Sequence, residues 1–362
     1  MNETDLLILD AAERLMSDFC TTEAVARHEA GVVSAELAEA VMDSGLPMAW
    51  VPEHFGGVGG SLTLGFDLIR KSASYALPLP LAETLVANLL LAVSGLSVPG
   101  GWAALGYDGG ALPVSERGEV DGTIEMASGA KEASVIVVPV LEKGYLRIAS
   151  FAPSTIDLEH RRNLAGEVRT RVILRSAIPS QLSGRIKTIS EDGVRQFCAL
   201  VRAAQIAGAL DRVSVLTAAY VAERKQFGRA LGKFQAIQHR IADIAGETAL
   251  AGAAVQQATR MLGACEHPLL GDHSTAISIA TAKVLAGEAA RKVPQDAHQA
   301  HGAMGFSYEY PLQHFTRRVW NWREEFGSEF YWSERIGFMI KDEVQAGPES
   351  SVFGLAWDFA TR

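Results

Sequence analysis

Hydrophobic and polar positions divide the chain into three stretches with different patterns. Up to about residue 100 the sequence is rich in helix formers, and helices are expected over residues 34–42, 63–76 and 81–93. Leu77–Pro80 contains two prolines and predicts an extended link between the last two of these helices. We therefore expect a helical N-terminal domain over residues 1–100.

The pattern changes near Pro99–Gly101, after which short β-type runs follow. Residues 134–140 are the clearest buried strand, and residues 168–174 begin with alternation and end apolar. Val120–Thr123 predicts a turn between strands. This stretch predicts a small middle β domain over residues 101–185.

From Ser190 onwards the chain returns to a helical pattern. Ser190 is a capping residue, and the acidic side chains that follow it suit the first turn of a helix. Residues 274–290 are rich in alanine, which allows the close helix contacts of a bundle. Apolar residues share one helix face in two other segments, with Val194, Phe197 and Val201 in the first and Ile237, Ile241 and Ile244 in the second. Residues 186–362 therefore predict a helical bundle, and the whole chain a mainly helical α+β fold.

Composition and charge argue against several classes of protein. The formal net charge of −9 does not favour binding to nucleic acid or to an anionic membrane surface. The longest apolar run, Leu85–Leu96, is shorter than the roughly 20 residues that span a bilayer. The cysteines are few and widely spaced, and the N-terminus is acidic and polar rather than basic and then apolar. We therefore expect a cytoplasmic protein without a signal peptide, a disulfide framework or a metal site.

Residues Ala222–Gly228, followed by Phe234 and Gln235, place an arginine, two amides and an aromatic ring at a junction between two predicted helices. Arg224 offers a planar fork of donors for phosphate oxygens, and the N-terminal end of the following helix favours negative charge. This set suits an anionic, aromatic ligand such as a dinucleotide. The pattern alone equally fits a basic loop between two core helices.

A second segment, Ala297–Phe306, follows a third helical pattern, and its glycines allow a backbone to approach a ligand closely. Together the two segments resemble the Glu-Arg-x-x-Phe-Gly…Gln and Gln-x-x-Gly-Gly-x-Gly motifs of the acyl-CoA dehydrogenase family. In that family these motifs hold the adenosine and pyrophosphate half of the FAD of a neighbouring subunit. Ala303 stands where the family usually has its second glycine. The resemblance implies contacts to FAD from Arg224, Gln226, Phe227, Gln235, Gln299, Gly302 and Ala303. It also implies that residues 186–362 form a four-helix bundle.

Two further sequence features bear on ligand binding. Val51–Ser61 resembles the family's Val-Pro-Glu-x-x-Gly-Gly-x-Gly turn. It does not fit a dinucleotide-binding loop, because no strand precedes it and the glycine spacing differs, so it predicts a structural turn between helices. His298 and His301 lie at i, i+3 spacing, but no third ligand follows at a metal-binding distance. His301 could instead contact a phosphate.

The catalytic base is the main departure from the family. The resemblance implies a glutamate just before a glycine near the C-terminus, but Phe326 occupies that position before Gly327. Glu325 is the candidate base, although one residue on a helix or turn rotates a side chain by about 100°. The alternative is that Glu325 and its acidic neighbours are solvated or paired with nearby arginines, the set being Glu324, Glu325 and Glu329 with Arg317, Arg318 and Arg323. A second place that the family uses for its base corresponds to Cys198–Ala199, where no carboxylate is present.

The motifs that surround the flavin ring in the family are also missing. The family's β domain usually carries a Thr-Glu-Pro-x-Ala-Gly-Ser-Asp stretch and a Trp-Ile-Thr-Asn strand. Near those positions this chain has Leu112–Gly118 and Thr123–Lys131, and neither matches. The chain thus keeps residues for the nucleotide tail of a neighbour's FAD and lacks those for its own flavin ring.

This pattern leads to three hypotheses. The first is an auxiliary subunit of a heterotetrameric acyl-CoA dehydrogenase of lipid metabolism, in which a homologous catalytic subunit supplies the ring pocket and the base. The second is an active homo-oligomer in which Glu325 is the base for α,β-dehydrogenation of an acyl-CoA. The third is a flavin-free structural homologue. The first two imply FAD, an acyl-CoA substrate and an electron acceptor.

Overall fold

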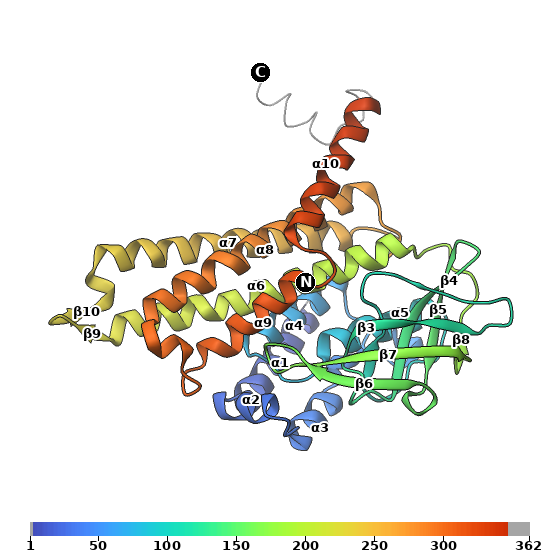
Figure 1. Ribbon diagram of the computed structural model, residues 1–362, viewed down its shortest axis with the longest axis horizontal. Coiled ribbons are helices and arrows are strands. Elements are labelled where there is room, and N and C mark those ends of the chain that lie inside the picture. The colour runs from blue at the N-terminus through green and yellow to red at the C-terminus, as the bar shows by residue number, and fades with distance from the viewer. Residues whose placement is uncertain (1–2, 347–362) are drawn as a thin grey trace.

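The N-terminal part of the chain is helical. The computed structural model describes residues 3–346 (Figure 1). Its first helices are α1 (Glu3–Phe19), α2 (Thr22–Glu29), α3 (Ala35–Asp43), α4 (Leu62–Ser74) and α5 (Leu81–Val93), with the short 3-10 helices η1 (Leu46–Met48) and η2 (Glu53–Phe55) between α3 and α4. Thr21, Ser34 and Ser61 cap α2, α3 and α4 by accepting hydrogen bonds from first-turn amides. The helices expected over residues 34–42, 63–76 and 81–93 are therefore confirmed.

The glycine-rich segment Val51–Ser61 forms a compact turn that leads into α4. Backbone hydrogen bonds fold it back on itself, among them Gly59 N to Val51 O at 2.8 Å and Gly60 N to Ala49 O at 2.9 Å. A Cβ atom on Gly57 would lie 2.0 Å from the carbonyl oxygen of Val51, so no other residue fits there. The prediction of a structural turn between helices is confirmed.

The strands follow and form one mixed sheet. They are β1 (Ala103–Leu105), β2 (Leu112–Pro113), β3 (Val120–Ser128), β4 (Val135–Glu142), β5 (Tyr145–Phe151), β6 (Asp157–Arg162), β7 (Val168–Ala177) and β8 (Gln181–Leu182). The order is β6-β7-β3-β1-β4-β5-β8, and β2 pairs with β4. β1 and β2 run parallel to β4, whereas the remaining neighbours are antiparallel. The sheet has its own apolar cluster, which includes Ile124, Ile136, Val138, Phe151 and Val172.

The turn predicted at Val120–Thr123 is wrong, because these residues begin strand β3. The pairing of β3 with β7 shifts register between Val120 and Gly122, which is typical of a β-bulge. Aspartate and glycine occur both in turns and at β-bulges, so the local sequence does not distinguish the two structures.

Five C-terminal helices complete the described chain: α6 (Glu191–Glu223), α7 (Gln235–Gly263), α8 (His273–His301), α9 (Leu312–Glu324) and α10 (Glu329–Ala346). Figure 1 shows α6, α7 and α8 lying side by side along the bundle, with α10 projecting away from it. α6 is buried along much of its length and packs against α4, α7, α8 and α9. Ser190 caps α6 as expected, because its hydroxyl accepts a hydrogen bond from Gly193 N at 2.9 Å.

The packing of α6 on α4 gives a test of the helix contacts. A Cβ atom on Gly208 of α6 would lie 1.9 Å from the carbonyl oxygen of Arg70 in α4, whereas a Cβ on exposed Gly246 of α7 would meet nothing within 4 Å. We expect Gly208→Ala to lower the free energy of unfolding by about 1–3 kcal/mol through overpacking. Gly246→Ala should raise it by up to about 1 kcal/mol, because alanine favours helix. Urea unfolding of both variants tests this, and equal stabilisation by both would contradict the close contact.

Among residues 3–346, no helix is both long and apolar enough to cross a membrane.

Candidate functional site

The segment between α6 and α7 forms an exposed hairpin at one end of the bundle. Its strands are β9 (Lys225–Gln226) and β10 (Arg229–Ala230), labelled at the left of Figure 1. Phe227 lies at the tip with φ of 52° and is 89% exposed. Such a conformation and exposure are unusual for phenylalanine, so packing within this chain does not explain the residue.

The hairpin carries cations that are free to bind an anion. Arg224, Lys225 and Lys233 form no ion pair with any residue in the described range. The guanidinium of Arg229 lies 4.1 Å from the centre of the Phe234 ring. Phe234 is also the N-cap of α7 and has no side-chain oxygen to accept from the first-turn amides. Exposed cations beside an uncapped helix N-terminus suit phosphate oxygens.

The glycine turn after α8 lies at the same end of the bundle. Gly302 ends α8 with φ of 60° and begins the 3-10 helix η5 (Gly302–Phe306). The ring of His301 stacks on Tyr220, four residues before Arg224, with centroids 4.3 Å apart. Tyr220 Oη also donates a hydrogen bond to the carbonyl oxygen of His301 at 3.3 Å. The ends of α6 and α8 are therefore in direct contact.

These contacts bring the expected FAD residues of the two motifs to one exposed end of the molecule. Both sets are open to solvent, the first with Arg224, Gln226, Phe227 and Gln235 and the second with Gln299, Gly302 and Ala303. The nucleotide tail of FAD fits this set, because the segment offers unpaired cations, amides, an exposed ring and a glycine turn. We name this set of seven residues the nucleotide clasp.

Glu325, the candidate base, lies in a different place, between α9 and α10 in the interior. Its Oε1 accepts hydrogen bonds from Arg169 Nε at 3.1 Å and Nη2 at 2.7 Å, and its Oε2 accepts one from Arg202 Nε at 2.7 Å. The expectation that nearby arginines pair with it is wrong, because both partners come from distant elements, β7 and α6. Glu324 and Glu329 do pair with Arg323 as expected.

The two guanidinium groups control the protonation of Glu325. Burial raises the pKa of this carboxyl, but the charges and hydrogen bonds of Arg169 and Arg202 outweigh burial and hold the pKa below its ordinary value. A carboxylate with a low pKa that already accepts several charged hydrogen bonds is a weak proton acceptor. Its environment therefore differs from that of a general base.

Arg202 joins three parts of the fold at this point. Its side chain is 2% exposed, and its Nη2 forms ion pairs with Glu83 of α5 at 2.8 Å and with Glu325 at 2.7 Å. Nη2 also donates to Ser128 Oγ of β3 at 3.4 Å, and the guanidinium lies 5.5 Å from the centre of the Phe326 ring. Residues from the N-terminal helices, the sheet and the C-terminal helices therefore meet at one buried cation.

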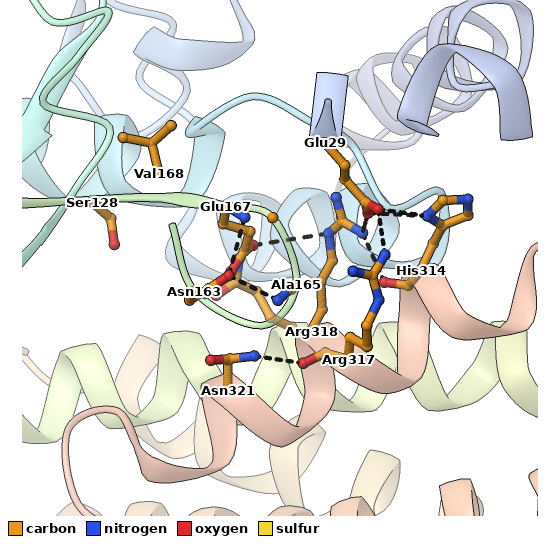
Figure 2. A network of polar contacts seen from close by, with 12 residues as sticks. Glu29, Ser128, Asn163, Ala165, Glu167, Val168, His314, Arg317, Arg318 and Asn321 are labelled. Carbon is orange, nitrogen blue, oxygen red and sulfur yellow. Dashed lines mark hydrogen bonds and ion pairs between the residues drawn. The ribbon is translucent and has the colours of Figure 1, made fainter. Parts of the chain in front are cut away.

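The ion pairs continue from Arg169 into a second cluster (Figure 2). Arg169 pairs with Glu167 at 2.9 Å, and Glu167 faces Arg318 at 3.9 Å. Arg318 in turn pairs at 2.6 Å with Glu29, at the end of α2. Arg317 and His314 of α9 also contact the Glu29 carboxylate. We call this series the interior charge chain, and its members are Glu83, Arg202, Glu325, Arg169, Glu167, Arg318, Glu29, Arg317 and His314.

Alternating signs explain how so many charges are tolerated inside the protein. Glu325, Glu167 and Glu29 each contact two arginines and Glu83 contacts one, so every carboxylate of the interior charge chain has a cationic partner. Little free space remains around it. A cavity of about 60 Å³ is lined by Ser128, Gly129, Glu167 and Arg169 among others. Another, of about 10 Å³, is lined by Glu83, Leu105, Cys198 and Phe326 among others.

The sequence pattern missed Glu83, Arg169, Arg202 and Lys283. Lys283 of α8 is fully buried, and its Nζ donates hydrogen bonds to the carbonyl oxygens of Arg323 and Gly327, both at 2.7 Å. It thereby fixes the segment that carries Glu325. A signal was present at Arg202, since a charged residue inside the apolar run of α6 requires a buried partner. Cys198 is buried, and burial raises the pKa of its thiol to about 12, which makes it unreactive.

The chain is similar in sequence to acyl-CoA dehydrogenases. The family model "Acyl-CoA dehydrogenase, C-terminal domain" matches residues 197–328. Acyl-CoA dehydrogenase IpdE2 of Mycolicibacterium smegmatis is 28% identical over 74% of this chain and 76% of its own length. Acyl-CoA dehydrogenase FadE34 of Mycobacterium tuberculosis is 26% identical over 82% of this chain and 40% of its own length.

Solved structures show the same fold. The ChsE4–ChsE5 complex from Mycobacterium tuberculosis matches with a TM-score of 0.82 at 19% identity, covering 93% of this chain and 97% of the matched chain. A variant of the Tcur3481–Tcur3483 steroid ACAD matches with a TM-score of 0.84 at 20% identity, covering 95% and 99%. The expected fold of helical N- and C-terminal parts around a β-rich middle is therefore confirmed.

Proposed function

This chain belongs to the acyl-CoA dehydrogenase family, and from that premise we propose that it is the auxiliary subunit of a heterotetrameric acyl-CoA dehydrogenase. The family's enzymes are oxidoreductases that use FAD, whose flavin ring accepts the hydride when an acyl-CoA thioester is desaturated. In this proposal the chain binds the nucleotide tail of that FAD, while a homologous catalytic subunit supplies the ring pocket and the base.

The state of Glu325 carries the proposal. Phe326 fills the family's base position, and the adjacent carboxylate is bound by Arg169 and Arg202. To take a proton from substrate, Glu325 would have to leave two buried cations, which is costly in a low-dielectric interior. The role of Glu325 is therefore to hold α6, β7 and the α9–α10 segment together.

The nucleotide clasp supplies the binding role. Arg224 and the cations near it are exposed and without ion pairs in the described part of the chain, so phosphate binding needs no internal bond to break. Phe227 projects from the hairpin tip, where it can contact an aromatic base or the surface of a partner. Both features suit a ligand shared with another subunit.

Names of the similar structures support a heteromeric enzyme. One is a complex of two different proteins, ChsE4 and ChsE5, and another, the Tcur3481–Tcur3483 steroid ACAD, also carries two component names. A bulky, steroid-like acyl-CoA is therefore the substrate class that we propose for the complex, with a separate electron acceptor.

The proposal is tested by expressing this chain alone and together with a homologous subunit encoded by an adjacent gene. We expect little flavin in the chain alone and a yellow complex with its partner. A yellow homo-oligomer with dye-reducing activity that is lost in Glu325→Gln would instead support an active enzyme with Glu325 as base. Absence of flavin in every combination would support a structural homologue.

Replacing Arg224 by alanine tests the nucleotide clasp directly. We expect the complex to lose FAD at least tenfold more readily, because a charged hydrogen bond to phosphate is worth about 1.5–3 kcal/mol. Flavin retained after dialysis is the measurement. Arg161→Ala is the matched control, since Arg161 lies exposed on edge strand β6 and pairs with Glu159. Equal retention in both variants would count against the clasp.

A further inference from the structure

Two segments that the family places around the flavin ring meet in this chain at one side chain. Thr123–Lys131 stands near the family's ring-binding strand, and its Ser128 accepts a hydrogen bond from Arg202 Nη2 at 3.4 Å. Phe326 stands at the family's base position, and its ring centre lies 5.5 Å from the Arg202 guanidinium. Arg202 therefore occupies the space between the segment near the family's ring-binding strand and the segment at the family's base position.

The remaining space is too small for the ring. The cavity that Arg202 itself lines has a volume of about 10 Å³, and a nearby cavity lined by Glu83, Ser128 and Gln205 among others has a volume of about 60 Å³. Pockets that bury a ligand of this size usually measure about 300–1,000 Å³. The smaller cavity, on the Phe326 side, has room for about one water molecule, so an acyl chain does not fit there either.

The side chains that fill this space are not free to move aside. Arg202 pairs with Glu83 and Glu325, and Glu325 also pairs with Arg169. Rotation of Arg202 towards solvent would leave two buried carboxylates without that counter-charge. Lys283 further fixes the backbone on both sides of Glu325 through the carbonyl oxygens of Arg323 and Gly327. Arg202 and its partners therefore fill this space permanently and do not act as a movable gate.

We infer that the interior charge chain fills the site at which this polypeptide would otherwise bind a flavin ring and an acyl thioester of its own. The inference rests on the proposed function and extends it to the cofactor content of the complex. Each flavin uses the nucleotide clasp of this chain and the ring pocket of the partner. The reverse combination, with the ring site in this chain, stays without flavin. The complex should therefore contain about one flavin for every two chains.

Flavin content of the co-purified complex tests the inference. Flavin released by denaturation is counted against both chains by amino-acid analysis. We expect about one flavin per pair of chains, and one per chain would overturn the inference while leaving the clasp intact.

Two fragments of FAD, added to this chain alone, separate the inference from the proposed function. Lumiflavin, which has only the ring, should show no saturable fluorescence quenching. Saturable binding of one lumiflavin per chain would contradict the inference that the site is closed. ADP, which has only the tail, should bind weakly and lose affinity in Arg224→Ala. Exclusion of lumiflavin together with ADP binding that is unchanged in Arg224→Ala would uphold the closed site and reject the clasp.

Discussion

Replacing Arg202 by alanine is expected to lower the free energy of unfolding by about 3–5 kcal/mol, because removal of one partner leaves buried charges uncompensated. Glu325 and Glu83 would face each other without the cation that now lies 2.7 and 2.8 Å from them. The N-terminal helices, the sheet and the C-terminal helices would also lose a shared contact. Urea unfolding followed by circular dichroism measures the change.

Two further variants test whether this loss of stability arises from the buried ion pair between Arg202 and Glu325. Arg175→Ala removes an arginine from an exposed pair with Asp157, whose side chains are 74% and 60% exposed, and should cost less than about 1 kcal/mol. The double variant Arg202→Met/Glu325→Leu should cost less than the sum of the two single changes, because it removes both charges of the pair. Additive costs would show that the two groups do not interact.

Acidification is expected to destabilise the protein in two steps that arise from adjacent residues of α2. Burial, with the nearby charges of Arg318 and Arg162, lowers the pKa of His28 from 6.5 to about 4. Burial raises the pKa of Glu29, but hydrogen bonds and charges from His314, Arg318 and Arg317 outweigh it and lower the pKa from 4.5 to about 2. In both cases the folded state binds its proton at lower pH than the unfolded state does.

The direction of the effect follows from proton linkage. Between pH 6.5 and 4 the unfolded chain protonates at His28 while the folded chain does not, so stability falls as pH falls. Between pH 4.5 and 2 the same applies to Glu29, whose full stabilisation is present above its unfolded pKa. Each step corresponds to about 3.5 kcal/mol, since one pKa unit is about 1.4 kcal/mol.

A pH series of urea unfolding from neutral pH to about pH 2 measures both steps. His28→Gln should flatten the upper step and leave the lower one. Glu29→Gln should lower stability at neutral pH and flatten the lower step, because the carboxylate that pairs with Arg317 and Arg318 is gone. Stability that stays constant from pH 6.5 to 4 in the unmodified protein would contradict the assignment to His28.

Local elements and local motifs were predictable from the sequence. Helix α5 spans the predicted residues 81–93, because an apolar run begins directly after Pro80 and ends before a serine and a glycine. The two nucleotide motifs are short and depend on residue types within about ten positions of one another, so they can be identified without a fold. The strand at Val120 was missed, because a bulge and a turn share the same residues.

Tertiary structure alone decided which charges meet. Glu325 binds Arg169 and Arg202, which are 156 and 123 residues away in the chain, and not the arginines closest in sequence. Sequence periodicity reports which face of an element is buried, whereas an ion pair depends on the approach of two elements in space. The sequence by itself therefore predicted several helices, the strands β4 and β7 and the two motifs of the proposed nucleotide clasp, whereas only the packing of α5, α6, β3 and β7 decided that Arg202 is buried among Glu83, Ser128 and Glu325.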